Sequence, residues 1–393
     1  MTKFPRVGVW FAAATTIFFT RAILFSTWQS RAPEVQAMLH LNTAEMGLMS
    51  MLYPTGGLVG LLFANSVNNR FGSSRVTIAG YSLAAAALAS LSFTVPAGLT
   101  FASAALLFVI GVPMGVADFV GNFEGTGVDS MSKRSLLPGI HAVFGVGMMG
   151  AAGFASLLLS HGVSLATNYL IIAVLVAIPS IWAGTVFPRR RQVHESQQAK
   201  AEHKRLTARV WREGRTWMLA SIAFAFAMAE LGAGTWVPIS LSQSGFDHTQ
   251  AAAAFGWFWV FITLGRTVGG GIVDRIGIRA TIVASVVMCT AGIVLFIFNG
   301  QLHQPYLALF LWGFGMANGI PLAINGASDA SALSAARINM IITVAYAAML
   351  SVGPSLGAIG QLIGINAAFA LPVLLLVFAA FASRVIAPRS ASA

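Results

Sequence analysis

The chain has 393 residues, of which 57% are hydrophobic and 9% are charged, and its formal net charge is +11. Soluble domains carry about a quarter of charged residues, so this composition excludes a water-soluble globular protein. The single cysteine, Cys289, excludes an internal disulfide and a CxxC metal or redox site.

Four long stretches contain no Lys, Arg, Asp or Glu, namely 76–117, 135–188, 280–328 and 338–383. Each stretch is long enough for two membrane-spanning helices of about 20 residues and a turn. We therefore predict an all-α membrane protein whose twelve spans lie, in chain order, near 8–30, 44–66, 75–95, 99–130, 138–160, 164–187, 216–241, 249–269, 279–299, 305–327, 338–361 and 365–386.

The sequence repeats itself at a constant offset of 205 residues. The matched positions are Pro33 with Pro238, Asn42 with Asp247, Gly60 with Gly265, Arg70 with Arg275, and Gly72 with Gly277. Self-similarity at about half the chain length, in so apolar a chain, is typical of secondary transporters. We expect two equivalent six-helix halves, 1–187 and 216–393, joined by a basic linker at 188–215.

The distribution of Lys and Arg predicts the orientation of the spans. The linker 188–215 is rich in both residues, whereas the opposite side of the predicted bundle keeps essentially only Arg31. The positive-inside rule then places both termini and the linker in the cytoplasm. No folded basic domain surrounds the linker, so we expect no nucleic-acid partner. We expect the first span to be a retained helix rather than a signal peptide.

A motif between spans eight and nine, G-x-x-x-D-R-x-G-x-R from Gly270 to Arg279, resembles the cytoplasmic loop motif of the major facilitator superfamily. The first copy departs from it, with Asn65 and Asn69 in place of the Gly and the Asp. The resemblance covers the whole chain. It implies a monomeric transporter in a bacterial inner membrane, acting on a small molecule and protons, with no enzymatic activity, cofactor or metal.

Finer details resemble bacterial permeases distantly related to fucose-type sugar symporters, among them Trp28-x-x-Arg31-x-Pro33. We expect the motif glycine, Gly270, to let two helices approach closely. The absence of Asp at Asn69 predicts a weaker latch in the first half. The residues that we assign to a cytoplasmic gate are Asp129, His141, Arg70, Gly72, Asp274, Arg275, Gly277 and Arg266.

Ionisable residues at membrane depth are costly and are functional by default. Arg21, Asp118, Glu124 and Glu230 lie well inside predicted spans. The family resemblance implies that spans one, four, seven and ten line a central cavity in which these groups meet. We predict Asp118 and Glu230 as proton-coupling carboxylates with Arg21 as their partner. The alternative is that Arg21 only neutralises a carboxylate so that the fold can insert.

Helical geometry adds an independent prediction for span four. Asp118, Asn122 and Asp129 lie within about 40° of one another, whereas Glu124 points roughly 120° away from Asp118. Because span five folds back, we expect His141 to lie near Asp129. The alternative for these two residues is a structural gate without a role in coupling.

Amides and indoles suit a hydroxylated ligand, because amides donate to and accept from hydroxyls and an indole stacks on a sugar face. Arg21 favours an anionic group on that ligand. Trp near the end of a span is also typical of the interfacial belt, so the Trp assignments have a structural alternative. The candidate substrate-binding residues are Asn122, Glu124, Asn318, Asn325, Gln29, Trp28 and Trp236.

We predict a proton-coupled importer of a small polar solute, such as a sugar or sugar acid. The alternative is a proton-driven efflux antiporter for drugs or sugars; a transport-inactive receptor would need a signalling appendage that the predicted loops leave little room for. The chain lacks a phosphate-cradling G-x-x-x-x-G-K motif, so we expect no ATP-driven step.

Overall fold

The computed structural model describes residues 5–132, 136–188, 205–298, 305–328 and 331–386. Within these ranges the chain is almost entirely helical and contains no strand. Twelve helices of the described part are long and apolar enough to cross a membrane. The all-α membrane fold predicted from the charge-free stretches is confirmed.

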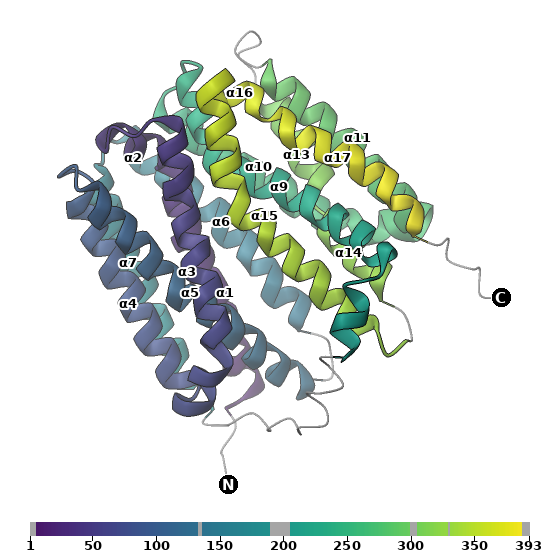
Figure 1. The fold of residues 1–393 in the computed structure, drawn as a ribbon. Coiled ribbons are helices and arrows are strands. Elements are labelled where there is room, and N and C mark those ends of the chain that lie inside the picture. Colours follow the sequence, from purple (N-terminus) through teal and green to yellow (C-terminus); the bar gives the residue numbers. More distant parts are fainter. Residues whose placement is uncertain (1–4, 133–135, 189–204, 299–304, 329–330, 387–393) are drawn as a thin grey trace. The chain divides into compact units, whose positions relative to one another are not determined.

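The helices divide into two compact units (Figure 1). The first comprises Met1–Gln192 and Val237–Gly256. Within it, α3 packs against α5, α4 against α7, and α1 against α6. Its complete helices are α1 (Val7–Ser30), α2 (Ala32–Met38), α3 (Thr43–Phe71), α4 (Ser73–Thr94), α5 (Thr100–Ser130), α6 (Leu137–Ser160) and α7 (Leu165–Val186).

The second unit comprises Val193–Trp236 and Trp257–Ala393. Helices α9 (Gly214–Gln243) and α10 (His248–Ile276) contribute residues to both units. The halves predicted at 1–187 and 216–393 stay a prediction. The remaining helices are α11 (Ile278–Ile297), α13 (Pro305–Met316), α14 (Gly319–Ala327), α15 (Ser334–Ile363), α16 (Ile365–Ala368) and α17 (Ala370–Ala382), followed by the 3₁₀ turn Ser383–Val385.

The repeat is visible in how α3 and α10 begin. Asn42 accepts a hydrogen bond from the backbone N–H of Glu45, whose carboxylate accepts one in return from the Asn42 N–H, both at 2.9 Å. Asp247 and Gln250 make the same reciprocal pair at 2.7 and 3.1 Å. Such a capping box satisfies donors that a helix start leaves unpaired. The sequence match of Asn42 with Asp247 is therefore also a structural match.

The loop-motif glycines repeat in backbone conformation as well. Gly72 adopts φ 81° and ψ 152°, and Gly277 adopts φ 80° and ψ 164°. Residues with a Cβ rarely enter this region, so glycine is required at both turns. Each turn directly precedes the next helix, which begins at Ser73 in one unit and at Ile278 in the other.

The tenth span differs from the single helix expected at 305–327. It is broken at Ala317 and Asn318 into α13 and α14. Asn318 has φ −109° and ψ 0°, and its side-chain Nδ2 donates to the carbonyl of Gly265 on α10 at 2.8 Å. An Asn that bonds a neighbouring backbone offers the chain an alternative to a continuous helix. Discontinuous helices of this kind are typical of binding regions in transporters.

Candidate functional site

An ion pair joins α1 and α5 within the first unit. One guanidinium nitrogen of Arg21 donates to Oδ1 of Asp118, and each side chain is 23% exposed. The guanidinium carbon also lies 5.6 Å from the centre of the Phe18 ring and 5.1 Å from that of Phe144. An arginine at this distance from an aromatic ring is attracted to it. Arg21 thus contacts Asp118, one of its two expected carboxylate partners, and the coupling role of the pair stays a prediction.

The polar stripe predicted on span four is also present. Asp118, Asn122 and Asp129 are all partly exposed along α5, whereas Glu124 is fully buried. The amide of Asn122 donates to the backbone carbonyl of Asp118 at 2.8 Å. Asp118, Asn122 and Asp129 lie on one face of α5 and are all partly exposed, so this face is accessible to a ligand or to water.

Glu124 lies in a polar cluster enclosed by three helices. Its carboxylate accepts from the indole Nε1 of Trp10 on α1 at 2.9 Å and from Oγ of Ser73 on α4 at 2.5 Å. A buried carboxylate persists when hydrogen bonds satisfy its oxygens. These contacts connect α1, α4 and α5. Its assignment to substrate binding stays a prediction.

Asp129 and His141 have contacts of their own within the first unit. Oδ1 of Asp129 accepts from the backbone N–H of Leu136, which ties the end of α5 to the start of α6. The His141 ring packs edge-on against Phe18 with 4.8 Å between ring centres. His141 therefore lies beside a residue whose ring also contacts Arg21. Proximity of Asp129 to His141 stays a prediction.

A second ion pair lies entirely within the second unit. A terminal guanidinium nitrogen of Arg266 on α10 donates to both carboxylate oxygens of Glu230 on α9, at 3.1 and 3.3 Å. The side chain of Glu230 is 15% exposed and that of Arg266 is 39% exposed. The sequence interpretation gave Glu230 only Arg21 as a partner and placed Arg266 in a gate. The structure thus supplies Glu230 with an arginine from its own unit.

A depth argument would have singled out Arg266 as a functional candidate. Arg266 lies ten residues before Ile276, the last residue of α10, which corresponds to about 15 Å along the helix axis. An arginine that far inside a span carries the same functional expectation as Arg21. The assignment of Arg266 to the gate followed the nearby loop motif instead.

The Glu230–Arg266 pair is connected to the break between α13 and α14. Nε of Arg266 donates to the carbonyl of Ala317 at 3.3 Å, and Asn318 donates back to Gly265. The two hydrogen bonds run in opposite directions between adjacent residues of α10 and the two residues of the break. Arg266 therefore binds both the carboxylate of Glu230 and the carbonyl of Ala317. In an intact helix, that carbonyl would accept a hydrogen bond from a backbone N–H of the same helix.

The close approach expected at the motif glycine occurs one residue earlier. Among the described residues, nothing lies within 4 Å of a Cβ built at Gly270, so the expectation for that residue is wrong in this structure. A Cβ at Gly269 would collide with the side chain of Asn318. Successive residues of a helix point about 100° apart, so the two adjacent glycines face different surroundings. Gly269 faces the helix break, and Gly270 is exposed.

The other candidate binding residues differ in burial. Trp28, Gln29 and Trp236 are buried, and Asn325 is exposed on α14. Within the described part of the chain, Oε1 of Gln29 and Nε1 of Trp236 have no hydrogen-bond partner. Buried polar atoms are normally paired, so each such atom needs an explanation, for example an absent ligand or water.

Five of the gate residues lie around the two repeated turns. Arg70 lies over the ring of Phe71 at 5.2 Å. In the second copy, Asp274 and Arg275 are exposed in the last turn of α10, which ends one residue before Gly277. Their assignment to a gate stays a prediction.

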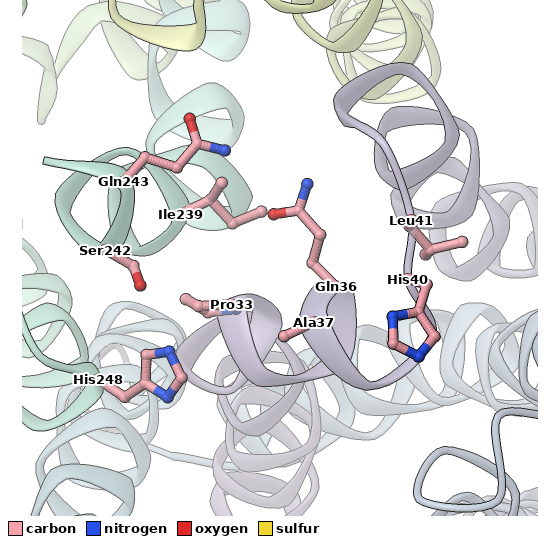
Figure 2. A pocket seen from close by; sticks show the side chains of 9 residues that line it. All are labelled: Pro33, Gln36, Ala37, His40, Leu41, Ile239, Ser242, Gln243 and His248. Atoms are coloured by element: carbon pink, nitrogen blue, oxygen red, sulfur yellow. The ribbon is translucent and has the colours of Figure 1, made fainter.

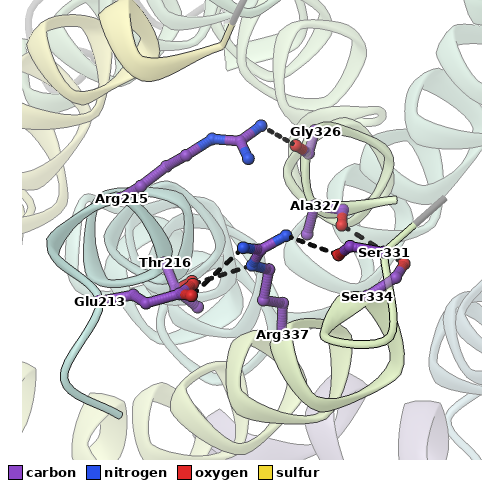
Figure 3. Close-up of polar contacts among 8 residues, drawn as sticks. All are labelled: Glu213, Arg215, Thr216, Gly326, Ala327, Ser331, Ser334 and Arg337. Carbon is purple, nitrogen blue, oxygen red and sulfur yellow. Dashed lines mark hydrogen bonds and ion pairs between the residues drawn. The ribbon is translucent and has the colours of Figure 1, made fainter. Parts of the chain in front are cut away.

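A further polar network lies where α9 and α15 begin, and Figure 3 shows its members. Arg337 donates to the two carboxylate oxygens of Glu213 at 2.8 and 3.2 Å, and to Oγ of Ser331 at 3.2 Å. Arg215 donates to the carbonyl of Gly326 at 3.1 Å. Hydrogen bonds from Arg337 hold the pKa of Glu213 below its usual value. The network links the start of α9 to the end of α14 and the start of α15, and the sequence interpretation missed it.

Comparison with known proteins agrees with this architecture. An uncharacterised MFS-type transporter of Yersinia pestis is 26% identical over 374 residues, which cover 94% of each chain. Among solved structures, the nucleoside transporter NupG matches with a TM-score of 0.75 at 15% identity, covering 96% of this chain and 98% of the other. A D-xylose–proton symporter matches with a TM-score of 0.69 at 13% identity, covering 95% and 96%.

Members of the Major Facilitator Superfamily move small-molecule substrates across membranes and are not enzymes. The family model of this superfamily matches residues 9–354. The chain belongs to the Major Facilitator Superfamily and is a multi-pass membrane transporter.

Proposed function

We propose that this protein is a proton-coupled importer of a small, neutral, hydroxylated solute. The observation that carries the proposal is that each unit holds its own carboxylate–arginine pair inside a membrane-spanning helix. Asp118 pairs with Arg21, and Glu230 pairs with Arg266. Paired charges at membrane depth are the usual components of proton relays.

Proton uptake at either carboxylate would remove one charge and leave an arginine without its partner. In the first unit, the rings of Phe18 and Phe144 lie close enough to Arg21 to stabilise the cation that remains. In the second unit, Arg266 is partly exposed and lies 6.0 Å from the centre of the Trp259 ring. Both sites therefore have a means of tolerating the protonated carboxylate, which a coupling site requires.

The second pair offers a route from proton binding to a change in helix geometry. Arg266 holds Glu230 through a terminal nitrogen and the carbonyl of Ala317 through Nε. Loss of the Glu230 charge frees this arginine to move, and its movement removes a hydrogen bond from the break between α13 and α14. Such a break lets two helix segments reorient with little loss of backbone hydrogen bonding.

The pairing favours a neutral solute over the anionic one that Arg21 by itself suggested. Each arginine already pairs with a carboxylate of its own unit, so neither cluster offers a net charge to a ligand. The polar groups that remain are amides and indoles, including the unpartnered atoms of Gln29 and Trp236. These groups suit hydroxyls. The similar folds of the nucleoside transporter NupG and the D-xylose–proton symporter suggest a nucleoside and a pentose as probes.

We propose a location in a bacterial inner membrane, as the family resemblance implies, and the excess of Lys and Arg in the linker supports placing both termini in the cytoplasm. We propose a monomer as the transporting unit, because members of the Major Facilitator Superfamily often act as monomers.

Ligand-induced thermal stabilisation of the detergent-purified protein tests the substrate class. The screen compares D-xylose, uridine, a sugar acid and a lipophilic cation. A saturable increase in melting temperature with D-xylose or uridine supports the proposal, because a ligand that binds only the folded state stabilises it. A shift with the lipophilic cation alone would favour the efflux alternative, and a shift with the sugar acid alone would contradict a neutral substrate.

A further inference from the structure

A cavity of about 360 Å³ lies between α2, the end of α9 and the start of α10, wholly within the first unit. Figure 2 shows its nine lining residues. Small-molecule pockets span about 300–1,000 Å³, so this cavity lies at the lower end of that range. Neither ion pair contributes to it. The residues that line the cavity are Pro33, Gln36, Ala37, His40, Leu41, Ile239, Ser242, Gln243 and His248.

The polar side chains of the cavity are free to bind a ligand. Two amides, one hydroxyl and two imidazoles line it, and among the described residues none of these five side chains makes a hydrogen bond to another. In Figure 2 the amides of Gln36 and Gln243 extend into the cavity from α2 and α9, and Ser242 points toward Pro33. Together these groups both donate and accept hydrogen bonds.

Both walls are held rigidly by contacts outside the cavity. Arg31 at the start of α2 is fully buried and donates to Asn168 at 3.1 Å, to Glu34 at 2.7 Å and to the carbonyl of Val163 at 3.2 Å. On the other side, the capping box of Asp247 and Gln250 fixes the start of α10. A preformed pocket loses little conformational entropy on binding, which favours affinity.

The lining chemistry selects the class of ligand. None of the nine lining residues is Lys, Arg, Asp or Glu, so the pocket offers no counter-charge to an ion. None is Phe, Tyr or Trp, so it offers no large stacking surface to a nucleobase. Pro33, Ala37, Leu41 and Ile239 form the apolar part. Hydroxyls on a compact carbon skeleton match this combination.

We propose that this cavity is a second binding site, which takes a monosaccharide or a similar polyol and is separate from the two ion pairs. The proposal rests on the proposed function for its ligand class. Under the proposed orientation the cavity faces the outside of the cell. A bound solute would bridge α2 and the end of α9 through Gln36 on one wall and Gln243 on the other.

Site-directed labelling tests this proposal, because the only native cysteine, Cys289, is buried. Ser242→Cys places a thiol in the cavity wall. Ala97→Cys places one on the exposed turn between α4 and α5 as the control. Both purified variants are reacted with a polar maleimide in the presence of increasing D-xylose or inositol. We expect one of these probes to slow labelling of Ser242→Cys, about tenfold at ten times its Kd, and to leave Ala97→Cys unaffected.

Two further variants separate this site from the two ion pairs. Gln36→Ala in the Ser242→Cys protein should abolish protection, whereas Glu230→Gln should leave protection intact even where transport is lost. Protection that vanishes with Glu230→Gln and survives Gln36→Ala would show that the solute acts from the ion pairs, and would overturn the proposal. If neither D-xylose nor inositol slows labelling of Ser242→Cys, the proposal is overturned as well. Failure of transport with protection retained would count against the proposed function alone.

Discussion

Arg266 contacts Glu230 and the carbonyl of Ala317 at the same time, through a terminal nitrogen at 3.1 Å and Nε at 3.3 Å. A carboxylate on α9 is thereby connected through one guanidinium to the point where the tenth span breaks. In the first unit, Arg21 lies instead between Asp118 and two phenyl rings. The two ion pairs therefore differ in what they hold.

Substitution of Arg266 should separate these two contacts. Arg266→Ala leaves Glu230 without its arginine and is expected to abolish gradient-driven transport and to lower the melting temperature. Arg266→Lys keeps a positive charge near Glu230, but a single ammonium cannot reproduce the two-sided contact. It should retain part of the stability and little transport.

The double variant Arg266→Ala/Glu230→Gln provides the control for stability. Because it removes both charges, it should recover part of the stability lost in Arg266→Ala. The expected coupling is about 1 kcal/mol, since Arg266 is partly exposed. Strictly additive losses in chemical or thermal unfolding would contradict a functional ion pair.

Two adjacent glycines of α10 offer a matched test of the helix break. Gly269→Ala drives a methyl group into the side chain of Asn318 and should disrupt its hydrogen bond to Gly265. Gly270→Ala meets open space and should be neutral or stabilise α10 by up to about 1 kcal/mol. Melting temperature and transport rate should both fall in the first variant only. Equal effects of the two substitutions would show that the close contact with Asn318 is unimportant.

Glu124 should respond to substitution as a structural residue. Glu124→Gln keeps an oxygen that accepts from Trp10 or Ser73, whereas Glu124→Ala leaves both donors without their acceptor. An unsatisfied buried donor costs about 1–3 kcal/mol, so Glu124→Ala should fold poorly. The yield of monodisperse protein and the Kd for the substrate distinguish a structural role of Glu124 from a role in substrate binding. A well-folded Glu124→Ala protein with weakened substrate binding would instead favour the ligand role predicted from the sequence.

The Glu213–Arg337 pair predicts a pH dependence of stability. Hydrogen bonds from Arg337 lower the pKa of Glu213 in the folded protein from the ordinary value of 4.5. A carboxylate with a lowered folded pKa stabilises the protein above its unfolded pKa, and this stabilisation is lost as the pH falls through the folded pKa. Wild type should therefore melt at a higher temperature than Glu213→Gln near neutral pH, and the difference should shrink below about pH 4. A difference that is independent of pH would contradict the ionic contribution.

The sequence predicted those features that depend on composition and on local geometry. The twelve spans follow from the charge-free stretches. The polar face of α5 follows from the helical angle between Asp118 and Asn122. Arg21 and Asp118 were identified because charge at membrane depth is rare, and their contact needed only that α1 and α5 be neighbours.

Features that depend on tertiary contacts were not predicted. The Glu230–Arg266 pair requires the relative rotation of α9 and α10, which periodicity does not give. The break at Asn318 was not predicted, because Asn occurs inside helices as well as at their ends. The hydrogen bond from Asn318 to Gly265 that accompanies the break is a tertiary contact. Similarly, which of Gly269 and Gly270 faces a neighbour is a matter of helix rotation, and the loop motif drew attention to the wrong one.

Solute uptake into proteoliposomes under an imposed proton gradient tests the central claim most directly. The solute is D-xylose or uridine, whichever stabilises the purified protein, and the variants are Asp118→Asn and Glu230→Gln. We predict that wild type accumulates the solute above its external concentration only while the outside is more acidic, and that each variant loses this accumulation. Full gradient-driven accumulation in both variants would contradict proton coupling through the two ion pairs.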